Sequence, residues 1–487
     1  MKERTNLDIK LYLIRSTSYM LLLGVAVCVI PLALAQRNTT KTKGGQARQP
    51  EQKINERGQA SPANIIIVTN TDDSGPGSLR DALASANDGD TILATGISGT
   101  ILLTSGELQI TTAVAINGPG AGSLTIDGNG TFRVFDNLTS GASISGFTIT
   151  NGSAPGASGG GIFNEGGNSA TLRLSDCIVS GNSADFGGGI FNLNGAPTVN
   201  NCTISGNGAA FSGGGIANSA SGAAATLTIT NSTISDNSAT ANDGGGILNG
   251  AAGSVASIAS VIVSNSTLSG NSATGNGGAA ANVADVPDLA RLTITNSTIS
   301  DNSATANGGG IYNQGNAQFQ IGSTVLNAGS SGENIFNGGQ ATSLGYNLSS
   351  DDGAGILIGT GDQINTDPML GPLQDNGGPT FTHALLPGSP AIDAGDPSFV
   401  PPPFFDQRGP GFDRVSGSGI DIGSFEVQVG GTPTPSPTAT ATGTASPTPT
   451  STATATVSPT PTSTARPSPT PRSAPTPRPR PTPPPRP

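Results

Sequence analysis

The chain carries a repeated alternation of hydrophobic and polar residues. The segment LTITNSTISDNSATAN occurs at Leu227–Asn242 and again at Leu292–Asn307, and a degenerate copy occupies Val261–Asn276. Within Leu227–Thr230 the Leu and Ile side chains point one way and the threonines the other, which is the period of a β-strand. Because such a short unit cannot bury its own apolar face, it must stack on copies of itself, and the pattern predicts a solenoid.

Each repeat also contains a glycine run followed by one apolar residue. Two or three short strands fit the spacing of these residues, whereas a propeller blade needs about 40–45 residues. The Gly, Thr and Asn content disfavours helical repeats. The pattern therefore predicts one coil of a parallel β-helix per repeat. The apolar residues are Ile162, Ile190, Ile216, Ile247, Ala280 and Ile311.

One asparagine holds the same position in four repeats. Neighbouring coils of a β-helix are about 4.8 Å apart, so equivalent residues lie directly above one another. We therefore expect a hydrogen-bonded amide ladder at a bend of the coil. Its members are Asn201, Asn231, Asn265 and Asn296.

Two cysteines share another repeat position. Cys177 and Cys202 both replace the serine of the NST motif, so they should be stacked, inward-facing neighbours. The coil spacing falls within the Cα separation of a disulfide, but parallel side chains do not readily give its dihedral angle. A buried, reduced pair is favoured, and a disulfide is the alternative.

The N-terminal residues are typical of a secretory signal peptide. Positively charged residues precede an apolar run at 20–35 that ends in Ala33-Leu34-Ala35. Residues 1–35 are predicted to be removed by cleavage after Ala35. An uncleaved membrane anchor is the alternative, since about 20 apolar residues span a bilayer. Residues 36–62 are polar and aperiodic, and are predicted to be a disordered linker.

The β-helix is predicted to occupy residues 64–342, beginning with the apolar run at Ile65. Residues Ser78–Asn87 place Leu79 and Leu83 on one face of a short helix. A helix over the first coil would cover its core and protect the free sheet edges.

The charge of the chain is concentrated in this predicted domain. Residues 63–431 hold 6 basic and 28 acidic side chains, a net charge of −22. Such an acidic body disfavours nucleic acid and anionic lipid as partners. It is consistent with solubility and with divalent cations.

Short glycine-containing motifs recur in the first coils at Asp88–Ile92, Ile116–Gly120, Thr125–Gly130 and Ile144–Ile149. They resemble the pectin-lyase-like right-handed parallel β-helix superfamily. The glycine runs that precede Phe163-Asn164 and Phe191-Asn192 are similar to the polymorphic outer-membrane-protein repeats of bacterial surface proteins. The resemblance implies an all-β, right-handed parallel β-helix exposed outside the cell.

The period breaks at residues 343–427. This segment contains Ser389–Gly395, Asp406–Gly409 and Asp421–Glu426, which resemble the choice-of-anchor domain of secreted bacterial proteins. The physical interpretation is a C-terminal cap that closes the last coils. Residues 428–487 are rich in Pro and Thr and are predicted to be a disordered tail.

The resemblance also raises catalysis, since the superfamily includes pectate lyases and polygalacturonases. Its lyases abstract a proton with a basic residue, often beside bound calcium. Between Ile92 and Gly345 the basic residues are Arg133, Arg173 and Arg291, and none is near a cluster of carboxylates in the repeat register. The single histidine, His383, falls in a motif of the anchor-like domain, which favours a structural role.

Hydrolases of this fold need paired carboxylates across the scissile bond. The candidates are Asp72-Asp73, Asp351-Asp352 and the repeat residues Asp236 and Asp301. The first two pairs lie in expected loops, and a single active site would not normally be copied in identical repeats. The chain has no Trp to serve as a sugar platform. No catalytic residue and no cofactor is therefore assigned.

Calcium is the one metal that the composition suggests. Four aspartates of the cap, Asp393, Asp396, Asp406 and Asp421, supply the hard oxygen ligands that calcium prefers. Turn-forming aspartates explain them equally well.

Together these features predict a secreted or cell-surface β-helix protein with a structural, adhesive or glycan-binding role. Its expected partner is a cell-envelope or extracellular polysaccharide or a surface protein, with membrane contact only through an uncleaved leader. A polysaccharide lyase or glycoside hydrolase of the same fold is the alternative. A groove that pairs a buried arginine with carboxylates would favour the enzyme, and a face of Thr, Ser and Asn rows would favour the scaffold.

Overall fold

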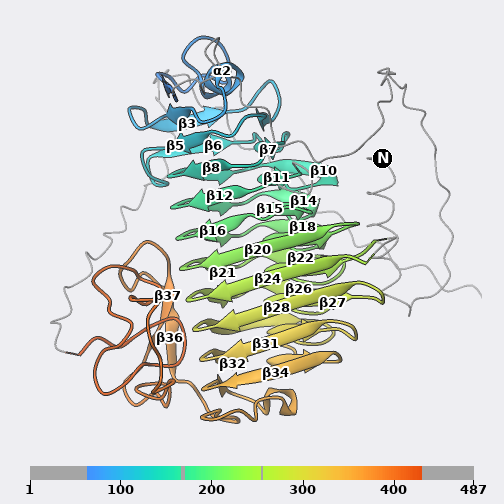
Figure 1. Cartoon of the computed structure of the whole chain (residues 1–487), viewed down its shortest axis with the longest axis vertical. Coiled ribbons are helices and arrows are strands. Elements are labelled where there is room, and N and C mark those ends of the chain that lie inside the picture. The colour runs from blue at the N-terminus through green and yellow to red at the C-terminus, as the bar shows by residue number, and fades with distance from the viewer. Residues whose placement is uncertain (1–62, 166–169, 254–255, 430–487) are drawn as a thin grey trace, which may run out of the picture. The chain divides into compact units, whose positions relative to one another are not determined.

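The computed structural model describes residues 63–165, 170–253 and 256–429, all of which belong to one compact unit of the chain. Within them the fold is an all-β, right-handed parallel β-helix, as predicted (Figure 1). The predicted signal peptide, the predicted linker and the tail beyond Val429 lie outside the described residues.

Three parallel sheets run the length of the coils, and each coil contributes a strand to each sheet in turn. The first sheet contains β1 (Ile65–Ile67), β2 (Thr91–Leu93), β5 (Ala115–Asn117), β8 (Ala142–Ser145), β12 (Leu172–Ser175), β16 (Thr198–Asn200), β20 (Ala224–Thr230), β24 (Ile258–Ser264), β28 (Leu289–Thr295), β31 (Gln318–Gly322) and β34 (Gln340–Gly345).

The second sheet follows a bend of the coil. It contains β3 (Gly99–Leu102), β6 (Leu124–Asp127), β9 (Thr148–Thr150), β13 (Ile178–Ser180), β17 (Thr203–Ser205), β21 (Thr233–Ser235), β25 (Thr267–Ser269), β29 (Thr298–Ala304), β32 (Val325–Ala328) and β35 (Leu348–Ser349). Through β29 it joins a strip formed by β10 (Ser153–Ser158), β14 (Ser183–Phe186), β18 (Gly208–Ser212), β22 (Ser238–Ala239) and β26 (Ser272–Ala273).

The third sheet carries the apolar residues that follow the glycine runs. Ile162, Ile190 and Ile216 stack in one column, as their spacing predicts. The sheet contains β4 (Leu108–Ile110), β7 (Phe135–Asn137), β11 (Ile162–Asn164), β15 (Ile190–Leu193), β19 (Ile216–Ala220), β23 (Ile247–Ala251), β27 (Ala280–Ala284), β30 (Ile311–Asn313) and β33 (Ile335–Asn337).

The duplicated segments stack in the register that their alternation predicts. Leu227–Thr230 pairs with Val261–Ser264, which pairs in turn with Leu292–Thr295. Leu227, Ile229, Val261, Val263, Leu292 and Ile294 are buried inside the coil, while the alternating positions face outward and carry hydroxyl side chains except for Ile262. Removal of each large apolar side chain from water stabilises the fold by about 1.5–3 kcal/mol, so the stacked columns supply most of the stability.

The repeated polar residues of the duplicated segment bend the coil. The residues on both sides of each short strand of the second sheet have positive φ angles of 48–67°. Only Gly, Asn and Asp enter this left-handed region at low cost, which explains their alternation at these positions. Asn231, Asn265 and Asn296 precede β21, β25 and β29. Asp236 and Gly270 follow β21 and β25, and Asp301 is the equivalent residue within the longer β29.

The predicted asparagine column exists, but it is not the main amide ladder. Among its four members, Nδ2 of Asn265 donates to Oδ1 of Asn231 at 2.8 Å, whereas Asn201 donates to Asp176 and Asn231 to Asn200. These side chains stand at an outer corner, where hydroxyl and carboxylate neighbours compete for them.

Two continuous ladders lie instead inside the coil. In the first, each amide donates to the next at 2.8–2.9 Å and also donates to a backbone carbonyl. Its members are Asn182, Asn207, Asn237, Asn271 and Asn302. The second ladder runs along the third sheet through Asn137, Asn164, Asn192, Asn218, Asn249, Asn282, Asn313 and Asn337.

Both ends of the coil stack are closed. Helix α2 (Leu79–Ser85) begins at Ser78, whose side chain accepts a hydrogen bond from the Asp81 amide, and it buries Leu79 and Leu83 over the first coil. This confirms the predicted capping helix. At the other end, the short helical turn η1 (Gly353–Gly355) leads to Leu357, which packs into the main core.

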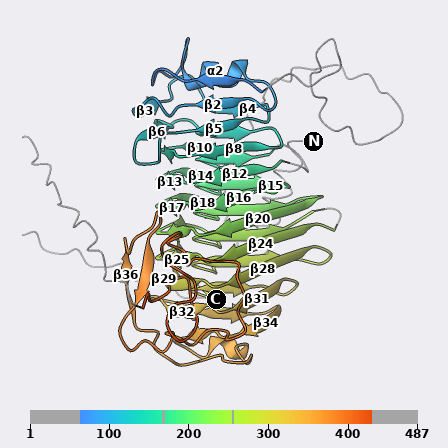
Figure 2. The same ribbon diagram turned by 60° about the vertical axis from the view of Figure 1, so that its left-hand side comes forward.

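Most of the predicted cap does not close the last coil. Residues 366–429, here called the C-terminal lobe, lie beside the second sheet and contain the antiparallel pair β36 (Leu370–Gln374) and β37 (Thr382–Leu385) (Figures 1 and 2). The residues that close the end are the preceding stretch around Leu357. The lobe packs on the second sheet because that polar face offers it hydrogen-bond partners, whereas the end of the last coil is already covered by Leu357.

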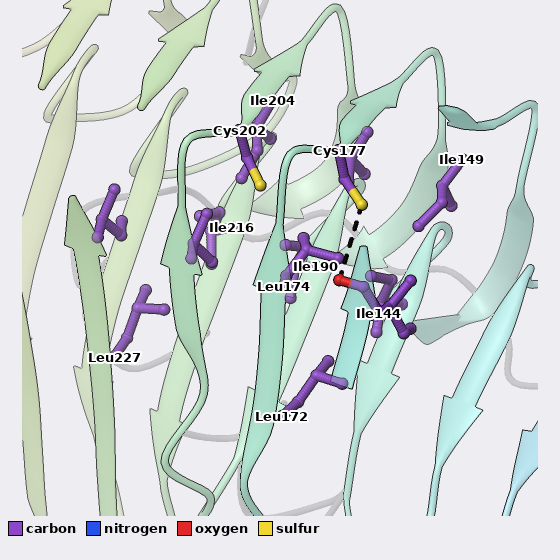
Figure 3. Close-up of a cluster of buried hydrophobic side chains, with 14 of the residues drawn as sticks. Ile144, Ile149, Leu172, Leu174, Cys177, Ile190, Cys202, Ile204, Ile216 and Leu227 are labelled. Carbon is purple, nitrogen blue, oxygen red and sulfur yellow. Dashed lines mark hydrogen bonds between the residues drawn. The ribbon is translucent and has the colours of Figure 1, made fainter. Parts of the chain in front are cut away.

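The two cysteines are stacked neighbours that point into the core (Figure 3). The backbone N–H of Thr203, next to Cys202, donates to the Cys177 carbonyl at 3.0 Å, which places the two residues on adjacent coils. Both are buried and both are free thiols in the structure. Burial, with a smaller contribution from Cys177, raises the pKa of Cys202 well above its usual value.

Candidate functional site

The outer face of the first sheet is mostly polar, with exposed apolar side chains such as Ile262 and Leu344 among the polar ones. Side chains at equivalent positions on successive strands form rows about 4.8 Å apart, and none of the eleven strands contains an Asp or Glu. One row contains Thr228, Ile262, Thr293, Gln320 and Thr342. The adjacent row contains Ser260, Arg291, Gln318 and Gln340.

A pocket of about 300 Å³ lies where these two rows cross β28, β31 and β34. Nε of Arg291 donates to Oε1 of Gln318 at 3.2 Å, and Nε2 of Gln318 donates to Oε1 of Gln340 at 3.2 Å. Arg291 and Gln340 are exposed and Gln318 is half-buried, so donors and acceptors of the row that are not used within it are open to a ligand. The pocket can therefore hydrogen-bond a hydroxyl-rich chain that runs along the coil axis.

A second pocket, of about 390 Å³, lies between α2 and β4. Its charged residues are Arg80 and Glu107. Glu107 pairs with Arg133 at 2.6 Å. Arg80 donates to the Asp73 carboxylate at 2.6 Å and to the carbonyl oxygens of Asp73, Gly106 and Glu107. Because these bonds use the guanidinium, Arg80 ties the helix to the first coils and is not free to hold a ligand.

The outer face of the second sheet is covered where the C-terminal lobe packs on it. Three threonines of successive coils, Thr233, Thr267 and Thr298, are buried there, although they belong to an outward-facing row. Gln407 bonds to Thr233 and Thr267, and Ser424 lies within 3.1 Å of the hydroxyls of Thr267 and Thr298. This face is therefore an internal interface rather than a free site.

His383 takes part in the same interface. Nε2 of His383 lies 2.9 Å from the Ser269 hydroxyl, and Nδ1 lies 2.7 Å from the Gly371 carbonyl. Burial lowers its pKa, despite opposing contributions from Gly371 and Asp301. His383 therefore has the structural role that its motif indicated.

The lobe is held together by buried charges. Arg408 pairs with Asp406 at 2.5 Å, and its guanidinium lies between the rings of Phe412 and Phe425, at 3.9 and 3.8 Å from their centroids. Asp406 and Arg408 come from the anchor-like motif Asp406–Gly409 and Phe425 from Asp421–Glu426, whereas Phe412 lies between the two motifs. Such stacked and paired arginines are typical of a rigid structural centre.

A second arginine of the lobe is fully buried beside acidic residues. Arg414 is 0% exposed, with Nη1 4.0 Å from Glu426 and Nη2 donating to the Gly423 carbonyl at 2.7 Å. Burial raises the pKa of Glu426 from 4.5 to about 8, opposed by the hydrogen bond from the Asp421 amide and by the charge of Arg414. Arg414 and Glu426 have the composition of a catalytic pair, but both are 0% exposed inside the lobe, where a polymer cannot reach them.

The structure does not bring the four calcium candidates together as a metal site. Asp406 pairs with Arg408, Asp396 accepts from Ser398, and Asp393 accepts from the Ser418 and Gly419 amides. Asp421 accepts from the Asp393 and Val427 amides. Across the described residues, no three His, Cys, Asp or Glu side chains form a group that could hold a metal ion. The aspartates act as turn and network residues.

The candidate catalytic carboxylates are also placed in structural roles. Burial opposes ionisation of Asp73, but hydrogen bonds from Ser105, Arg80 and Thr104 outweigh it and lower its pKa to about 2. Asp351 accepts the Asn334 and Gly353 amides, and Asp352 caps η1. Asp236 and Asp301 occupy equivalent left-handed bends in the first and third copies of the repeat. None of these residues faces the pocket beside Arg291.

Sequence reasoning did not identify the row that contains Arg291, Gln318 and Gln340. The three residues occupy outward positions of three consecutive strands, which the alternation could have revealed. The strands β31 and β34 were not aligned with the repeat because they lack the Thr and Ser pattern of the preceding coils.

No family model matches the chain, and no curated protein matches it. Among solved structures, the chain is similar to a crystal structure of pectate lyase Pel9A, at 14% identity and a TM-score of 0.41. The match covers 75% of this chain and 97% of that one.

No helix within residues 63–165, 170–253 and 256–429 has the length and apolar character needed to cross a bilayer.

Proposed function

We propose that the protein is an exported, non-catalytic β-helix scaffold that binds a polysaccharide of the cell envelope or extracellular space. The binding surface is the outer face of the first sheet, centred on Arg291, Gln318 and Gln340. The observation that carries the proposal is the continuous row of exposed donors and acceptors on consecutive coils, without any carboxylate in the sheet.

A regular row suits a polymer better than a small ligand. The coil spacing places Arg291, Gln318 and Gln340 about 4.8 Å apart along the row, so a linear chain with repeated hydroxyls meets a hydrogen-bonding side chain at each step. Individual bonds at an exposed face contribute little, and affinity depends on their number. This supports a low-affinity, multivalent adhesive role.

The positions of the carboxylates support a role without catalysis. A retaining or inverting hydrolase needs two carboxylates that flank one bond. The acidic side chains described above are engaged in bends, caps and ion pairs, and the buried Arg414 and Glu426 have no opening to a substrate.

We also infer that the protein acts outside the cell and that the lobe belongs to the anchor-like type which its motifs resemble. The support is the predicted leader, together with the use of Gln407 and Ser424 of those motifs in docking the lobe on the coils and of Arg408 in pairing with Asp406 inside the lobe.

Binding of the full chain to an array of envelope and extracellular glycans tests the proposal. Arg291→Ala and Gln318→Ala should each weaken binding to the bound glycan by about tenfold. Arg173→Ala is the matched control, because Arg173 is exposed on β12 of the same sheet but lies outside the pocket. Retention of full binding by both pocket variants, or the absence of any bound glycan, would contradict the proposal.

A further inference from the structure

The C-terminal lobe exposes a group of hydrophobic side chains around one backbone bridge. Phe404, Val415 and Val429 are 67, 50 and 69% exposed, and we call them the Phe404 patch. The bridge joins Phe405 to Asp413 in antiparallel orientation.

Backbone contacts hold the members of the patch close together. The Arg414 amide donates to the Phe404 carbonyl at 3.0 Å, which places Val415 next to the Phe404 segment. The Val429 amide donates to the Ser416 hydroxyl at 2.8 Å, and Gln428 donates to the Asp413 carbonyl at 3.0 Å. These hydrogen bonds hold the three chain segments that carry Phe404, Val415 and Val429 close together.

The packing of the lobe does not need this patch. The lobe has its own apolar core, formed by Leu385, Ala391, Ile422 and Phe425 against the last coils. Each large apolar side chain left in water forgoes about 1.5–3 kcal/mol of stabilisation. A cluster of them on one surface is typical of an interaction site.

The surroundings of the patch are negatively charged. Asp413 is exposed beside Phe405, and the carboxylate of Asp393 lies next to Val429 over Gly417. All three basic side chains described in the lobe, His383, Arg408 and Arg414, are buried. The patch is therefore an apolar surface with an acidic rim and no exposed cation of the lobe to neutralise it.

We propose that the Phe404 patch binds a positively charged, apolar segment of a protein partner. Aliphatic side chains of the partner would cover Val415 and Val429, and a Lys or Arg would reach Asp393, Asp413 or the face of the Phe404 ring. A neutral saccharide fits less well, because the patch offers aliphatic groups and carboxylates rather than the mixed donors of the first sheet. The site is separate from the proposed glycan surface and does not depend on it.

The test uses the full chain and a labelled synthetic peptide of alternating lysine and leucine, with fluorescence anisotropy as the readout. Binding should weaken by about tenfold in Phe404→Ser and in Val415→Ser. Asp393→Asn combined with Asp413→Asn should weaken binding and reduce its dependence on salt. Val286→Ser is the matched control, since Val286 is 81% exposed on a coil loop, and it should leave binding unchanged.

Circular dichroism of each variant checks that the exposed substitutions leave the fold intact. Equal affinity of all variants would show general attraction to an acidic protein and would overturn the proposal. So would equal binding of a glutamate–leucine peptide, or binding that requires Phe404 for a neutral glycan and not for the lysine–leucine peptide.

Discussion

Nε2 of Gln407 donates a hydrogen bond to Oγ1 of Thr233 at 2.9 Å, although the two residues are 174 positions apart. The same side chain accepts a bond from Thr267 at 2.6 Å, so one amide joins equivalent positions of two consecutive coils. Ser424 makes the corresponding link between Thr267 and Thr298. The lobe thus recognises three stacked threonines, and Ile178 interrupts the same row farther toward the N-terminus.

Gln407→Ala should loosen the lobe from the coils. Gln407 is fully buried, and its loss leaves the hydroxyls of Thr233, Thr267 and Thr380 without that partner. We expect a destabilisation of about 2–3 kcal/mol. Hydrogen exchange should report faster exchange in residues 370–427 than in the coils.

The matched control for this substitution is Gln320→Ala on the exposed face of β31, which should change stability by less than about 0.5 kcal/mol. Equal effects of the two substitutions would mean that Gln407 does not hold the lobe.

Much of the coil could be predicted from the sequence, because alternation and repeat spacing are local properties. Equivalent residues of neighbouring coils lie about 4.8 Å apart, so the stacking of Ile162, Ile190 and Ile216 follows directly from the repeat spacing in the sequence. The location of the amide ladders did not follow. Asn231 and Asn237 are both conspicuous in one repeat, and only the bends decide that Asn237 points inward while Asn231 stands at the outer corner.

Asn237→Ala should be strongly destabilising, because Asn237 lies in the middle of a buried ladder. Its amide bonds to Asn271 and to the Ile204 carbonyl, and it accepts bonds from Asn207. Removal leaves several buried polar groups unpaired, and we expect a loss of about 2–4 kcal/mol in the free energy of unfolding, measured by urea denaturation.

Asn231→Gly provides the comparison within the same repeat. Asn231 has a φ angle of 50°, which glycine adopts without strain. The predicted decrease in the free energy of unfolding is below about 1 kcal/mol. A larger loss for Asn231→Gly than for Asn237→Ala would contradict the assignment of the ladders.

Glu426 should make stability depend on pH. Burial raises its pKa from 4.5 to about 8 in the folded protein, so the folded state keeps a proton that the unfolded chain releases above pH 4.5. The contribution of Glu426 to the free energy of unfolding is therefore fully present below pH 4.5 and is lost as the pH rises through 8. Glu426→Gln should flatten the fall in unfolding free energy across this range.

Asp73 provides a control of opposite sign. Hydrogen bonds lower its folded pKa to about 2, so its contribution is present above pH 3.8 and is lost as the pH falls through 2. Asp73→Asn should alter stability in acid and leave the slope between pH 4.5 and 8 intact. An unchanged slope in Glu426→Gln would show that another group titrates there.

The thiols of Cys177 and Cys202 should be unreactive until the protein unfolds. Both are buried, and burial raises the pKa of Cys202, so little thiolate is available to attack. A maleimide reagent at pH 7.5 should label neither residue in the folded protein and both in 6 M guanidinium, as located by peptide mass analysis. A failure to label them after unfolding without reductant would show that they form a disulfide.

The position of the lobe is the part of the fold that the local pattern could not reveal. The motifs around Gln407 and Ser424 look like turns, and their partners lie more than 120 residues away on the duplicated segment. The Phe404 patch was equally hidden, since exposure of Phe404, Val415 and Val429 depends on which side of the lobe meets the coils. Long-range packing decides both.

The central claim is that the exposed face of the first sheet binds a polysaccharide without cleaving it. The most direct measurement incubates the full chain with the glycan that it retains best on the array, and follows chain length by size-exclusion chromatography and new reducing or unsaturated ends by absorbance. We predict saturable binding that requires Arg291 and Gln318, with chain length unchanged. Shortening of the polymer by the wild-type protein, above the level in a heat-denatured control, would contradict the account.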